Sequence, residues 1–592
     1  MIEILFFIVY FLTVPRMLHI MQQESYQNDG MFRWIAKNPK QAFGKGFIQM
    51  IITIITLLIS SLVMILLAKY TNIFSDMKAI YADIPTLIAF VVFFYINLSN
   101  FFVEHKIRKS AKKPLKYTAR VKRLIFYNFL VCALLEVFIL QILESHNVYS
   151  TACIPVLYSF LVFTLPVNMI ISNWFASPLE TAIANRYKQK AYNILNKKEY
   201  KNLIKIGITG SYDKTSTKYI LKTILEEKYN VLATPGSFNT SMGNVRVIRE
   251  QLKPEHEVFI SEMGARKKHD IQEICDFVRP HIGIITSIGA QHLETFKTID
   301  NVAKTKGELL LGVKNKNSNG IEYNQYESIT SIAKRMFSII KQDNNENETE
   351  INRLLEDGAV FLNKDGGKCE ELYKNDSHER KYLFSADDKN ANIYAKNIKS
   401  GPEGSEFTVV SEKYKEYNCK TKLLGKHNVQ NIIGAIAIAE YMGLTKEQIQ
   451  SGVSKIEPVE HRLQLLPSTN GTIVIDDAFN SNPIGSKAAL DVVKEFNGRK
   501  IIVTPGMVEL GAEENKLNKE FGKQMADVVD YAILVGPNHT KPIQEGLKEK
   551  NFNDMNIYVV SNLDEATQKL GQITKAGDVI LFENDLPDSY NE

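Results

Sequence analysis

Long apolar stretches separated by polar ones fill the first third of the chain. A helix needs roughly 20 apolar residues to cross a bilayer. Four stretches reach that length, and they cover approximately residues 47–67, 84–103, 124–143 and 152–174. A fifth, residues 2–21, carries Arg16 and His19 near its end but has no basic start and no small-residue cleavage site, so we interpret it as a span rather than a signal peptide. The pattern predicts a membrane domain of about five transmembrane helices over residues 1–178.

The loops between these stretches predict an orientation. The loop between the third and fourth spans, EHKIRKSAKKPLKYTARVKR, is rich in Lys and Arg, whereas the next loop, ESHNVYS, has neither. Because basic loops stay on the cytoplasmic side, we expect a multi-pass protein of the cell membrane with its N-terminus outside. Everything after about residue 174 then lies in the cytoplasm. We interpret the basic loop as an orientation signal that contacts anionic lipids, rather than as a substrate site.

One carboxyl group falls in the middle of a predicted span, at Glu136 in the fourth. A carboxyl group at that depth is costly and is often functional. Two interpretations remain open: a substrate or relay role, and a protonated carboxyl group bonded to a neighbouring helix.

The hydrophobic pattern changes after the last span. An amphipathic stretch over residues 179–200 leads into short β-type runs that alternate with helical ones: KIGITG, YNVLAT, HEVFISEMG and HIGIITSIG. A second series begins near Gly471 with GTIVIDDAF, RKIIVTPG, DYAILVG, NIYVVS and DVILFEN. This alternation is typical of parallel sheets with helices on both faces. We therefore expect a linker over residues 179–200, a central α/β domain over 201–462 and a C-terminal α/β domain over 463–592.

Charge and cysteine content exclude some classes of protein. The net charge of +5 is small for 592 residues and argues against a general nucleic-acid binder. The five cysteines are scattered and form no CxxC pair. The pattern therefore predicts neither a disulfide framework nor a zinc site, and it fits a reducing compartment.

The segment GITGSYDKTSTK has the setting of a phosphate-binding loop, because it follows an apolar strand and precedes a helical run. In such a loop backbone N–H groups and the helix N-terminus hold the phosphates. Lys214 would reach the terminal phosphates and the Thr215 hydroxyl would hold Mg²⁺. Asp213 stands where the usual pattern has a glycine, so we expect an adapted or weakened nucleotide site. The nucleotide-binding residues expected here are Gly207, Thr209, Gly210, Ser211, Asp213, Lys214, Thr215 and Ser216.

Two further groups fall at predicted strand ends, where open α/β sheets bind their ligands. Glu262 ends the strand in HEVFISEMG, and His292 follows the strand in HIGIITSIGAQH. A carboxylate in that place can complete a Mg²⁺ shell. We expect Glu262 as a metal ligand and His292 on the same rim.

Nine segments occur in a fixed order along the chain: GITGSYDKTSTK, TPGSFNTSMG, SEMGARKKHDI, TSIGAQHLETF, VAKTKGELLLG, LGKHNVQNIIGAIAIAEYMGL, EHRLQ, IDDAFNSNP and TPGMVELG. The series resembles the Mur ligase family, and within it most closely the enzymes that add D-alanyl-D-alanine to a UDP-muramoyl tripeptide. The resemblance covers roughly residues 200–585. It implies a P-loop central domain, a Rossmann-like C-terminal domain and an ATP-dependent amide ligase. In such a ligase ATP converts a carboxylate into an acyl phosphate, which an amine then attacks.

The resemblance also implies roles for single residues. Lys214 would act on the ATP phosphates, Thr215 and Glu262 would hold one Mg²⁺, and His292 would hold a second. Lys306 matches a lysine that is carbamylated in many members, with Lys304 as the less favoured candidate. Further nucleotide contacts would come from Asn428, Asn431, Arg462, Asp477 and Asn480.

Some of these residues also have plainer interpretations. Asp476 and Asp477 could be strand-end acids that cap the next helix, and Arg462 could form a surface salt bridge. Their occurrence in family order favours the nucleotide site.

Three features depart from the family pattern. Asp213 replaces a glycine, five predicted spans occupy the place of a domain that binds the UDP end of the substrate, and the terminal segment DVILFENDLPDSYNE lacks a Lys-Gly-Ser segment. We expect a cell-envelope precursor, with a lipid-linked form as one option, and an amine or amino acid as substrates. Membrane lipids and cell-wall synthesis proteins are the expected partners, without nucleic acid.

Two alternatives stand beside this hypothesis. One is a ligase for another lipid-linked or polymer carboxylate. The other is a catalytically weakened Mur-like scaffold at the membrane, which Asp213 favours. An ATP-driven transporter is disfavoured, because no second nucleotide-binding half is visible.

Overall fold

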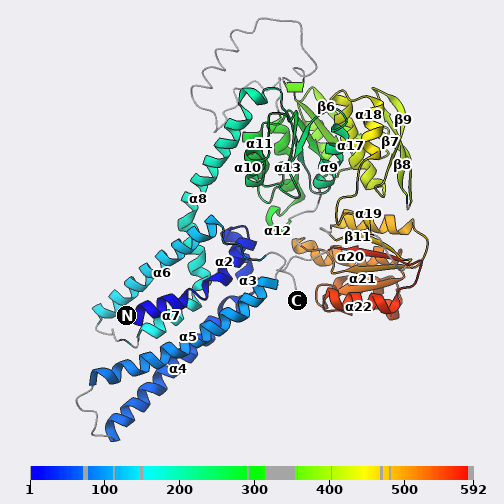
Figure 1. Ribbon diagram of the computed structural model, residues 1–592. Helices are drawn as coiled ribbons and strands as arrows, with labels where there is room; N and C mark the ends of the chain where they lie inside the picture. The colour runs from blue at the N-terminus through cyan, green and yellow to red at the C-terminus, as the bar shows by residue number, and fades with distance from the viewer. Residues whose placement is uncertain are drawn as a thin grey trace. The chain divides into compact units, whose positions relative to one another are not determined.

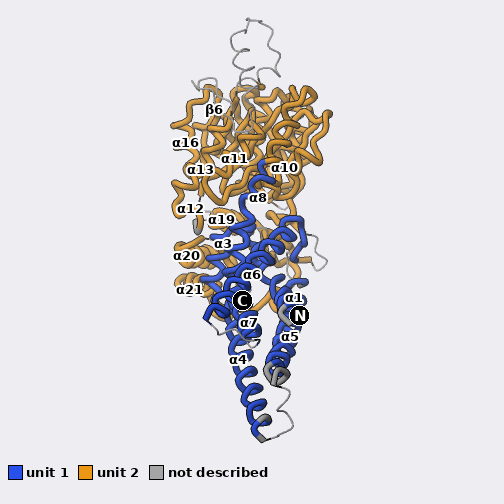
Figure 2. Tube along the Cα trace, turned by 90° about the vertical axis from the view of Figure 1, so that its left-hand side faces the viewer, with its two compact units in different colours: residues 1–185 blue, residues 186–592 orange. Residues whose placement is uncertain are grey.

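The chain forms two compact units, Met1–Asn185 and Arg186–Glu592 (Figure 2). The computed structural model describes residues 2–70, 78–110, 114–146, 151, 153–289, 293–313, 354–355, 358–401, 403–466, 471–478, 482–508 and 510–584. The first unit is built of helices, and the second contains two sheets with helices packed on them (Figure 1). The expected fold class, a helical membrane domain followed by two α/β domains, is confirmed.

The first unit contains both short helices and long apolar ones. Their bounds are α1 (Ile2–Tyr10), α2 (Val14–Gln23), α3 (Asn28–Lys37), α4 (Pro39–Tyr70), α5 (Lys78–Ser110), α6 (Ala119–Ser145), α7 (Cys153–Phe163) and α8 (Leu165–Leu195). Within the described residues, four helical stretches are long and apolar enough to cross a membrane, namely Ile4–Gln23, Pro39–Leu67, Asp83–Lys109 and Ala119–Ser145. A bent pair formed by α7 and α8 makes a fifth if it counts as one broken span.

The last predicted span differs from the expectation of one continuous helix over residues 152–174. It breaks at Thr164 into α7 and α8, which meet at 70°. Pro166 is the second residue of α8 and has no N–H to continue the hydrogen bonds of α7, so the proline accounts for the break. Beyond the bend, α8 runs without interruption to Leu195, through most of the expected linker.

Glu136 of α6 has a partner on a neighbouring helix. The Tyr158 hydroxyl of α7 donates to Oε1 of Glu136 over 2.5 Å. This contact favours the second of the two interpretations above, in which the carboxyl group joins two helices.

The first sheet of the second unit carries the predicted phosphate loop. Within the described residues it has nine strands in the order β2-β3-β1-β4-β5-β6-β7-β8-β9. The strands are β1 (Ile204–Thr209), β2 (Val231–Ala233), β3 (Val258–Glu262), β4 (Ile282–Ile285), β5 (Ala359–Asn363), β6 (Arg380–Ser385), β7 (Ile393–Gly401), β8 (Gly404–Ser411) and β9 (Lys415–Thr421). Strands β1 to β7 pair in parallel, and β8 and β9 pair antiparallel.

Helices connect and cover these strands. They are α9 (Lys214–Leu225), α10 (Ser241–Glu250), α11 (Asp270–Val278), α12 (Leu293–Phe296), α13 (Ile299–Gly312), α16 (Cys369–Asn375), α17 (Lys426–Tyr441) and α18 (Lys446–Ser454). β1 is mostly buried because strands flank it on both sides, and Ile206 and Ile208 are fully buried against the apolar side of α9. This burial fixes the end of β1, where the loop begins.

The second sheet has six strands within the described residues, in the order β10-β11-β15-β12-β13-β14. The strands are β10 (Gln464–Leu466), β11 (Ile473–Asp477), β12 (Lys500–Thr504), β13 (Tyr531–Val535), β14 (Ile557–Val560) and β15 (Val579–Glu583). The helices are α19 (Pro483–Lys494), α20 (Glu514–Ala526), α21 (Lys541–Glu549) and α22 (Leu563–Ile573). The five expected parallel strands are present, and β10 adds an antiparallel edge strand that the sequence analysis did not include.

Candidate active site

The site begins at the carboxyl end of β1. This strand lies between β3 and β4, and its register pairs Ile208 with Glu262. Thr209 ends the strand, the next four residues turn, and α9 begins at Lys214. The order strand, loop and helix that the sequence predicted is therefore present, and Glu262 lies on the neighbouring strand end beside the loop.

Two residues of the loop have the backbone conformation that favours glycine. Gly210 has φ 157°, and a Cβ added there would meet Thr286 Oγ1 at 2.0 Å. Asp213 has φ 64° and ψ 4°, in the left-handed region. Short polar residues such as Asp tolerate this region better than other side chains do. The loop therefore keeps the shape of a glycine loop although Asp213 carries a side chain.

Lys214 is folded back over the loop. Its Nζ donates to the carbonyl oxygens of Gly210 at 2.6 Å and Ser211 at 3.0 Å. Burial lowers the pKa of Lys214 from 10.5 to about 8, against the opposing effect of Glu262. The ammonium group thus lies where the phosphates of a nucleotide would lie, and it still carries its proton at neutral pH.

Glu262 is a fully buried acceptor for three side chains. Oε1 accepts from Thr215 Oγ1 at 3.0 Å and from Asn239 Nδ2 at 3.2 Å, and Oε2 accepts from Lys218 Nζ at 2.9 Å. Lys218 is also fully buried, and it donates a second bond to the Gly236 carbonyl at 2.5 Å. The sequence analysis did not single out Lys218. The signal was its position four residues after Lys214, on the same side of a helix.

Thr215 and Glu262 fit a magnesium ion. A hydroxyl and a carboxylate are hard oxygen ligands, which Mg²⁺ prefers. In an octahedral shell with bonds of about 2.1 Å, neighbouring ligand oxygens lie about 3 Å apart. The two oxygens here lie 3.0 Å apart. His292 lies outside the described residues, and within the described part of the chain no group of three or more His, Cys, Asp and Glu side chains could hold a metal.

Lys306 of α13 lies in the same electrostatic environment. It is 1% exposed, whereas Lys304 on the same helix is exposed. Burial holds the pKa of Lys306 well below its ordinary value, the positive charge of Lys214 lowers it further, and nearby carboxylates including Glu262 oppose both effects. Helix α13 packs closely on β1, because a Cβ at Gly207 would meet Leu309 at 2.8 Å. These positions favour Lys306 over Lys304 as the lysine of the site.

The remaining loop residues are held by neighbouring strand ends. Thr209 Oγ1 donates to the Met263 carbonyl at 2.8 Å, and Ser211 Oγ accepts from the Gly289 N–H at 3.0 Å. Ser216 is buried in the first turn of α9. These contacts make the loop rigid before any ligand arrives.

Helix α17 brings two expected asparagines to this domain. Asn428 Nδ2 donates to the Leu424 carbonyl at 2.8 Å. Asn431 is 4% exposed, and its Nδ2 has no hydrogen-bond partner among the described residues. A buried donor of this kind fits an acceptor supplied by a ligand.

The C-terminal sheet contributes charges to the loop. Burial raises the pKa of Asp477 to about 6, Arg462 and the Leu463 N–H oppose this shift, and the negative charge of Asp213 adds to it. Arg462 also contributes to the lowered pKa of Lys214. Arg462 and Asp477 therefore interact electrostatically with Lys214 and Asp213 of the phosphate-binding loop.

The plainer interpretation of the two strand-end acids is not supported. Asp476 accepts from His461 Nδ1 at 2.6 Å, and Asp477 accepts from the Leu463 N–H at 3.2 Å. The next helix, α19, is capped by Asn482 instead. Asn480 lies outside the described residues.

A glycine loop with a lysine at the start of a helix, a buried hydroxyl and carboxylate that fit a metal, and a second α/β domain are the features of a nucleotide-dependent enzyme of the P-loop class. Comparison with known families agrees. The chain matches the Mur ligase middle domain over residues 208–352 and 347–439, and the Mur ligase glutamate ligase domain over residues 461–583. The chain belongs to the Mur ligase family, an ATP-dependent class of C–N bond-forming ligases, as the motif series predicted.

Two curated relatives illustrate the similarity. The UDP-N-acetylmuramoyl-tripeptide–D-alanyl-D-alanine ligase of Bacillus subtilis (strain 168) is 26% identical over 381 residues, which are 64% of this chain and 72% of that enzyme. The enzyme of the same name from Escherichia coli (strain K12) is 28% identical over 332 residues, 56% of this chain and 64% of that enzyme. The match to the second thus spans slightly less than two thirds of its length.

Solved structures share the fold. The crystal structure of MurF from Acinetobacter baumannii has a TM-score of 0.55 and 21% identity, and covers 69% of this chain and 78% of that one. MurF from Thermotoga maritima in complex with ADP has a TM-score of 0.54 and 20% identity, and covers 68% of this chain and 80% of that one. At this identity the likeness concerns the fold.

Proposed function

We propose that the protein is an ATP-dependent amide ligase that acts on a cell-envelope precursor at the cytoplasmic face of the membrane. The observation that carries the proposal is the convergence of Lys214, the Thr215–Glu262 pair and the buried Lys306 at the end of β1. These groups suit a reaction in which a phosphoryl group is transferred and negative charge develops.

The roles follow from the positions. Lys214 and the first turn of α9 bind the phosphates of ATP, and Thr215 and Glu262 hold Mg²⁺, which neutralises phosphate charge when it is bound. The substrate carboxylate takes the terminal phosphoryl group and becomes an acyl phosphate, and ADP leaves. The nitrogen of the amine then attacks the carbonyl carbon, phosphate leaves, and the nitrogen loses a proton.

Lys306 is proposed to act as a carbamate. Its low pKa leaves more of the amine unprotonated, and only the unprotonated amine can attack CO₂. The new N–C bond releases a proton and turns a cation into an anion, which can help to hold a metal. His292, although outside the described residues, stays in the proposal as a ligand of a second Mg²⁺.

The C-terminal domain is proposed to complete the site. Asn428, Asn431, Arg462, Asp477 and Asn480 would contact the nucleotide. A second domain that closes over ATP orients the reactants and keeps water from the acyl phosphate. The electrostatic interaction of Arg462 with Lys214 supports this arrangement.

The carboxylate substrate is proposed to be membrane-bound. The two matched family domains begin at residue 208, and the preceding unit has apolar helices suited to a bilayer. The related enzymes act, by their names, on a UDP-muramoyl tripeptide and D-alanyl-D-alanine. For this chain we propose a lipid-linked or otherwise membrane-proximal carboxylate and an amine or amino acid, with the N-terminus outside the cell and both α/β domains in the cytoplasm.

Asp213 supports one alternative function, a weakened Mur-like scaffold that brings cell-wall enzymes to the membrane. Its carboxylate would lie near the phosphates, and at about 4 Å two like charges repel by roughly 1 kcal/mol in water and by more in a drier site. The loop shape and the intact Lys214 argue for an attenuated enzyme instead.

The deciding measurement is ATP turnover by the full-length protein in lipid, with and without a lipid extract from the source cells. We expect turnover that rises with the extract and that Lys214→Ala abolishes. Lys222→Ala, which removes a partly exposed lysine of the same helix, is the matched control and should change turnover by less than about twofold. If the natural chain neither binds nor hydrolyses ATP while Asp213→Gly does both, the scaffold function replaces the enzymatic one.

A further inference from the structure

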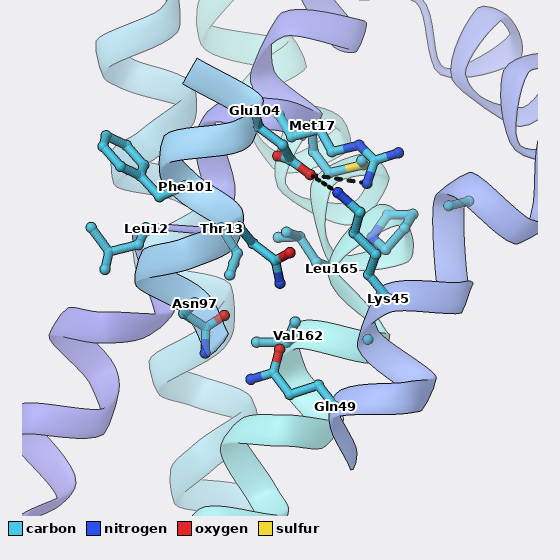
Figure 3. Close-up of a pocket in the computed structure, with 15 residues that line it drawn as sticks. Leu12, Thr13, Met17, Lys45, Gln49, Asn97, Phe101, Glu104, Val162 and Leu165 are labelled. Carbon is cyan, nitrogen blue, oxygen red and sulfur yellow. Dashed lines mark hydrogen bonds and ion pairs between the residues drawn. The ribbon is translucent and has the colours of Figure 1, made fainter. Parts of the chain in front are cut away.

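A small polar pocket lies inside the helical unit, between α2, α4, α5 and the bend that joins α7 to α8 (Figure 3). Its cavity volume is about 50 Å³. Because about 10–15 Å³ of such space suffices for one water molecule, the pocket has room for a group the size of a phosphate. All of its lining residues belong to the first unit, so it is separate from the candidate active site.

Charged side chains gather at one end of the pocket. Glu104 Oε1 lies 3.1 Å from Arg16 Nη1 and 3.0 Å from Lys45 Nζ, and Oε2 lies 3.8 Å from Arg108 Nη1. Of these residues, Arg16, Lys45 and Glu104 line the pocket and give it one excess positive charge, whereas Arg108 lies outside the lining. The side chains of Glu104 and Arg16 are 13% and 21% exposed, so solvent screens these two charges only in part, whereas the Lys45 side chain is 47% exposed and is screened more fully. A concave site with excess positive charge attracts an anion.

Unpaired amide groups lie at the other end. Gln49 is 2% exposed and Asn97 is fully buried. Neither Gln49 Nε2 nor Asn97 Oδ1 has a hydrogen-bond partner among the described residues, although Asn97 Nδ2 donates to the Phe93 carbonyl at 2.7 Å. Buried polar atoms are rarely left unpaired. One free donor and one free acceptor together match a hydroxyl group, which can accept and donate at once.

The charged end and the amide end of the pocket lie at different positions along α4 and α5. Gln49 follows Lys45 by one turn of α4, and Asn97 precedes Glu104 by two turns of α5. Figure 3 shows Lys45 and Glu104 turned toward each other, with the side chains of Gln49 and Asn97 at the opposite end of the pocket. Residues 47–67 and 84–103 are the apolar parts of these helices. The charges therefore lie at the edge of the apolar layer, and the amides lie within it, where polar groups are expensive and usually functional.

We propose that this pocket binds the anionic head of a ligand that carries a phosphate and hydroxyl groups. The phosphate lies against Arg16 and Lys45, and a hydroxyl group reaches Gln49 and Asn97. This chemistry occurs in a phospholipid such as phosphatidylglycerol and in soluble molecules such as glycerol phosphate. The inference goes beyond the ligase function and does not depend on it.

Binding is tested on the full-length protein in a neutral detergent, without ATP. The probes are phosphatidylglycerol, phosphatidylcholine, glycerol 3-phosphate and inorganic phosphate, and bound molecules are counted by native mass spectrometry. We expect saturable binding of phosphatidylglycerol that is at least about tenfold weaker in the double variant Arg16→Gln/Lys45→Gln. The control is Lys40→Gln, an exposed lysine on the same helix outside the pocket, which should change binding by less than about twofold.

A second variant separates binding from folding. Glu104→Gln removes the internal anion that competes for the three cations, so it should strengthen binding by about two- to fivefold. A variant that only damages the fold would weaken binding instead. Thermal unfolding of each variant identifies those that do not fold.

The soluble probes decide the source of the head group. Competition by glycerol 3-phosphate or inorganic phosphate at concentrations equal to the lipid assigns the pocket to a soluble phosphate, and competition by neither assigns it to a lipid. The proposal is overturned if no probe binds saturably, if Lys40→Gln weakens binding as much as the double variant Arg16→Gln/Lys45→Gln does, or if Glu104→Gln in a folded protein weakens it. ATP turnover is measured separately, so failure here leaves the proposed ligase function standing.

Discussion

The ammonium group of Lys218 lies 2.9 Å from Oε2 of Glu262, and neither side chain is exposed to solvent. This buried ion pair ties the first turns of α9 to the end of β3. It also fixes the carboxylate whose other oxygen faces Thr215. The pair therefore positions a proposed magnesium ligand.

Replacement of one partner should destabilise the protein strongly. Lys218→Met leaves the Glu262 charge buried and unpaired, which costs about 3–5 kcal/mol. For a domain of this size we expect the midpoint of thermal unfolding to fall by roughly 6–10 °C, measured on the full-length protein in detergent. Lys222→Met breaks a partly exposed pair with Glu226 on the same helix and should cost about 0.3–0.5 kcal/mol. If Lys218→Met and Lys222→Met lowered the midpoint of thermal unfolding equally, burial would not strengthen the Lys218–Glu262 pair.

The activity should decrease above about pH 8. The pKa of Lys214 is about 8, lowered from 10.5 chiefly by burial. Only the protonated amine attracts phosphate, so kcat/KM for ATP should fall about tenfold for each pH unit above this value. Lys214→Arg, which stays charged at all these pH values, should move the decrease out of the measured range.

The titration of Lys214 itself would not destabilise the fold in this range. The folded-state pKa of Lys214 lies below its ordinary value, so between about pH 8 and 10.5 the unfolded chain binds more protons than the folded one. The contribution of Lys214 to stability therefore rises with pH in that window. A pH profile of the midpoint of thermal unfolding checks this sign independently of activity.

Lys306 should make the activity depend on CO₂. Removal of CO₂ from the buffers should lower ATP turnover by about 10- to 100-fold, and bicarbonate should restore it, if a carbamate on Lys306 helps to hold a metal. Lys306→Ala should be inactive with and without bicarbonate. Lys304→Ala removes an exposed lysine of the same helix and should behave as the natural chain does. Activity that does not respond to CO₂ would contradict the carbamate.

The charge of Asp213 should weaken ATP binding, and its left-handed backbone conformation should destabilise the fold. Asp213→Asn removes the charge and should lower KM for ATP by about five- to tenfold. Asp213→Gly should do the same and, in addition, remove a left-handed backbone cost of order 1 kcal/mol, which raises the midpoint of unfolding. The difference between the two variants separates charge from conformation. An unchanged KM in both would remove Asp213 as the cause of weak binding.

Local patterns predicted the strand, loop and helix that form the candidate site. The strand, loop and helix around Lys214 are encoded within one segment, and the strand end at Glu262 follows from the alternation of strands and helices. Burial depends on distant segments and was not predictable in this way. Lys218 was therefore missed although it lies inside the quoted motif, because its position one turn after Lys214 gives the side of the helix but does not show that the lysine is buried.

Two of the misses in the fold had weak local signals. Strand β9, KEYNCKT, buries every second residue, Tyr417, Cys419 and Thr421, and this alternation predicts an antiparallel strand. The bend between α7 and α8 follows from Pro166, which lies inside an otherwise apolar run. In β9 the polar average of the segment concealed the alternation of buried residues. In the run around Pro166 the apolar average concealed the proline.

The left-handed backbone conformation of Asp213 bears on how this residue can change by mutation. Codons for aspartate and glycine differ at one nucleotide, and the backbone of the loop already has the shape that glycine requires. A single base substitution would therefore replace the side chain without any rearrangement of the loop. If Asp213 weakens ATP binding as proposed, one mutational step therefore separates the attenuated site from a stronger one.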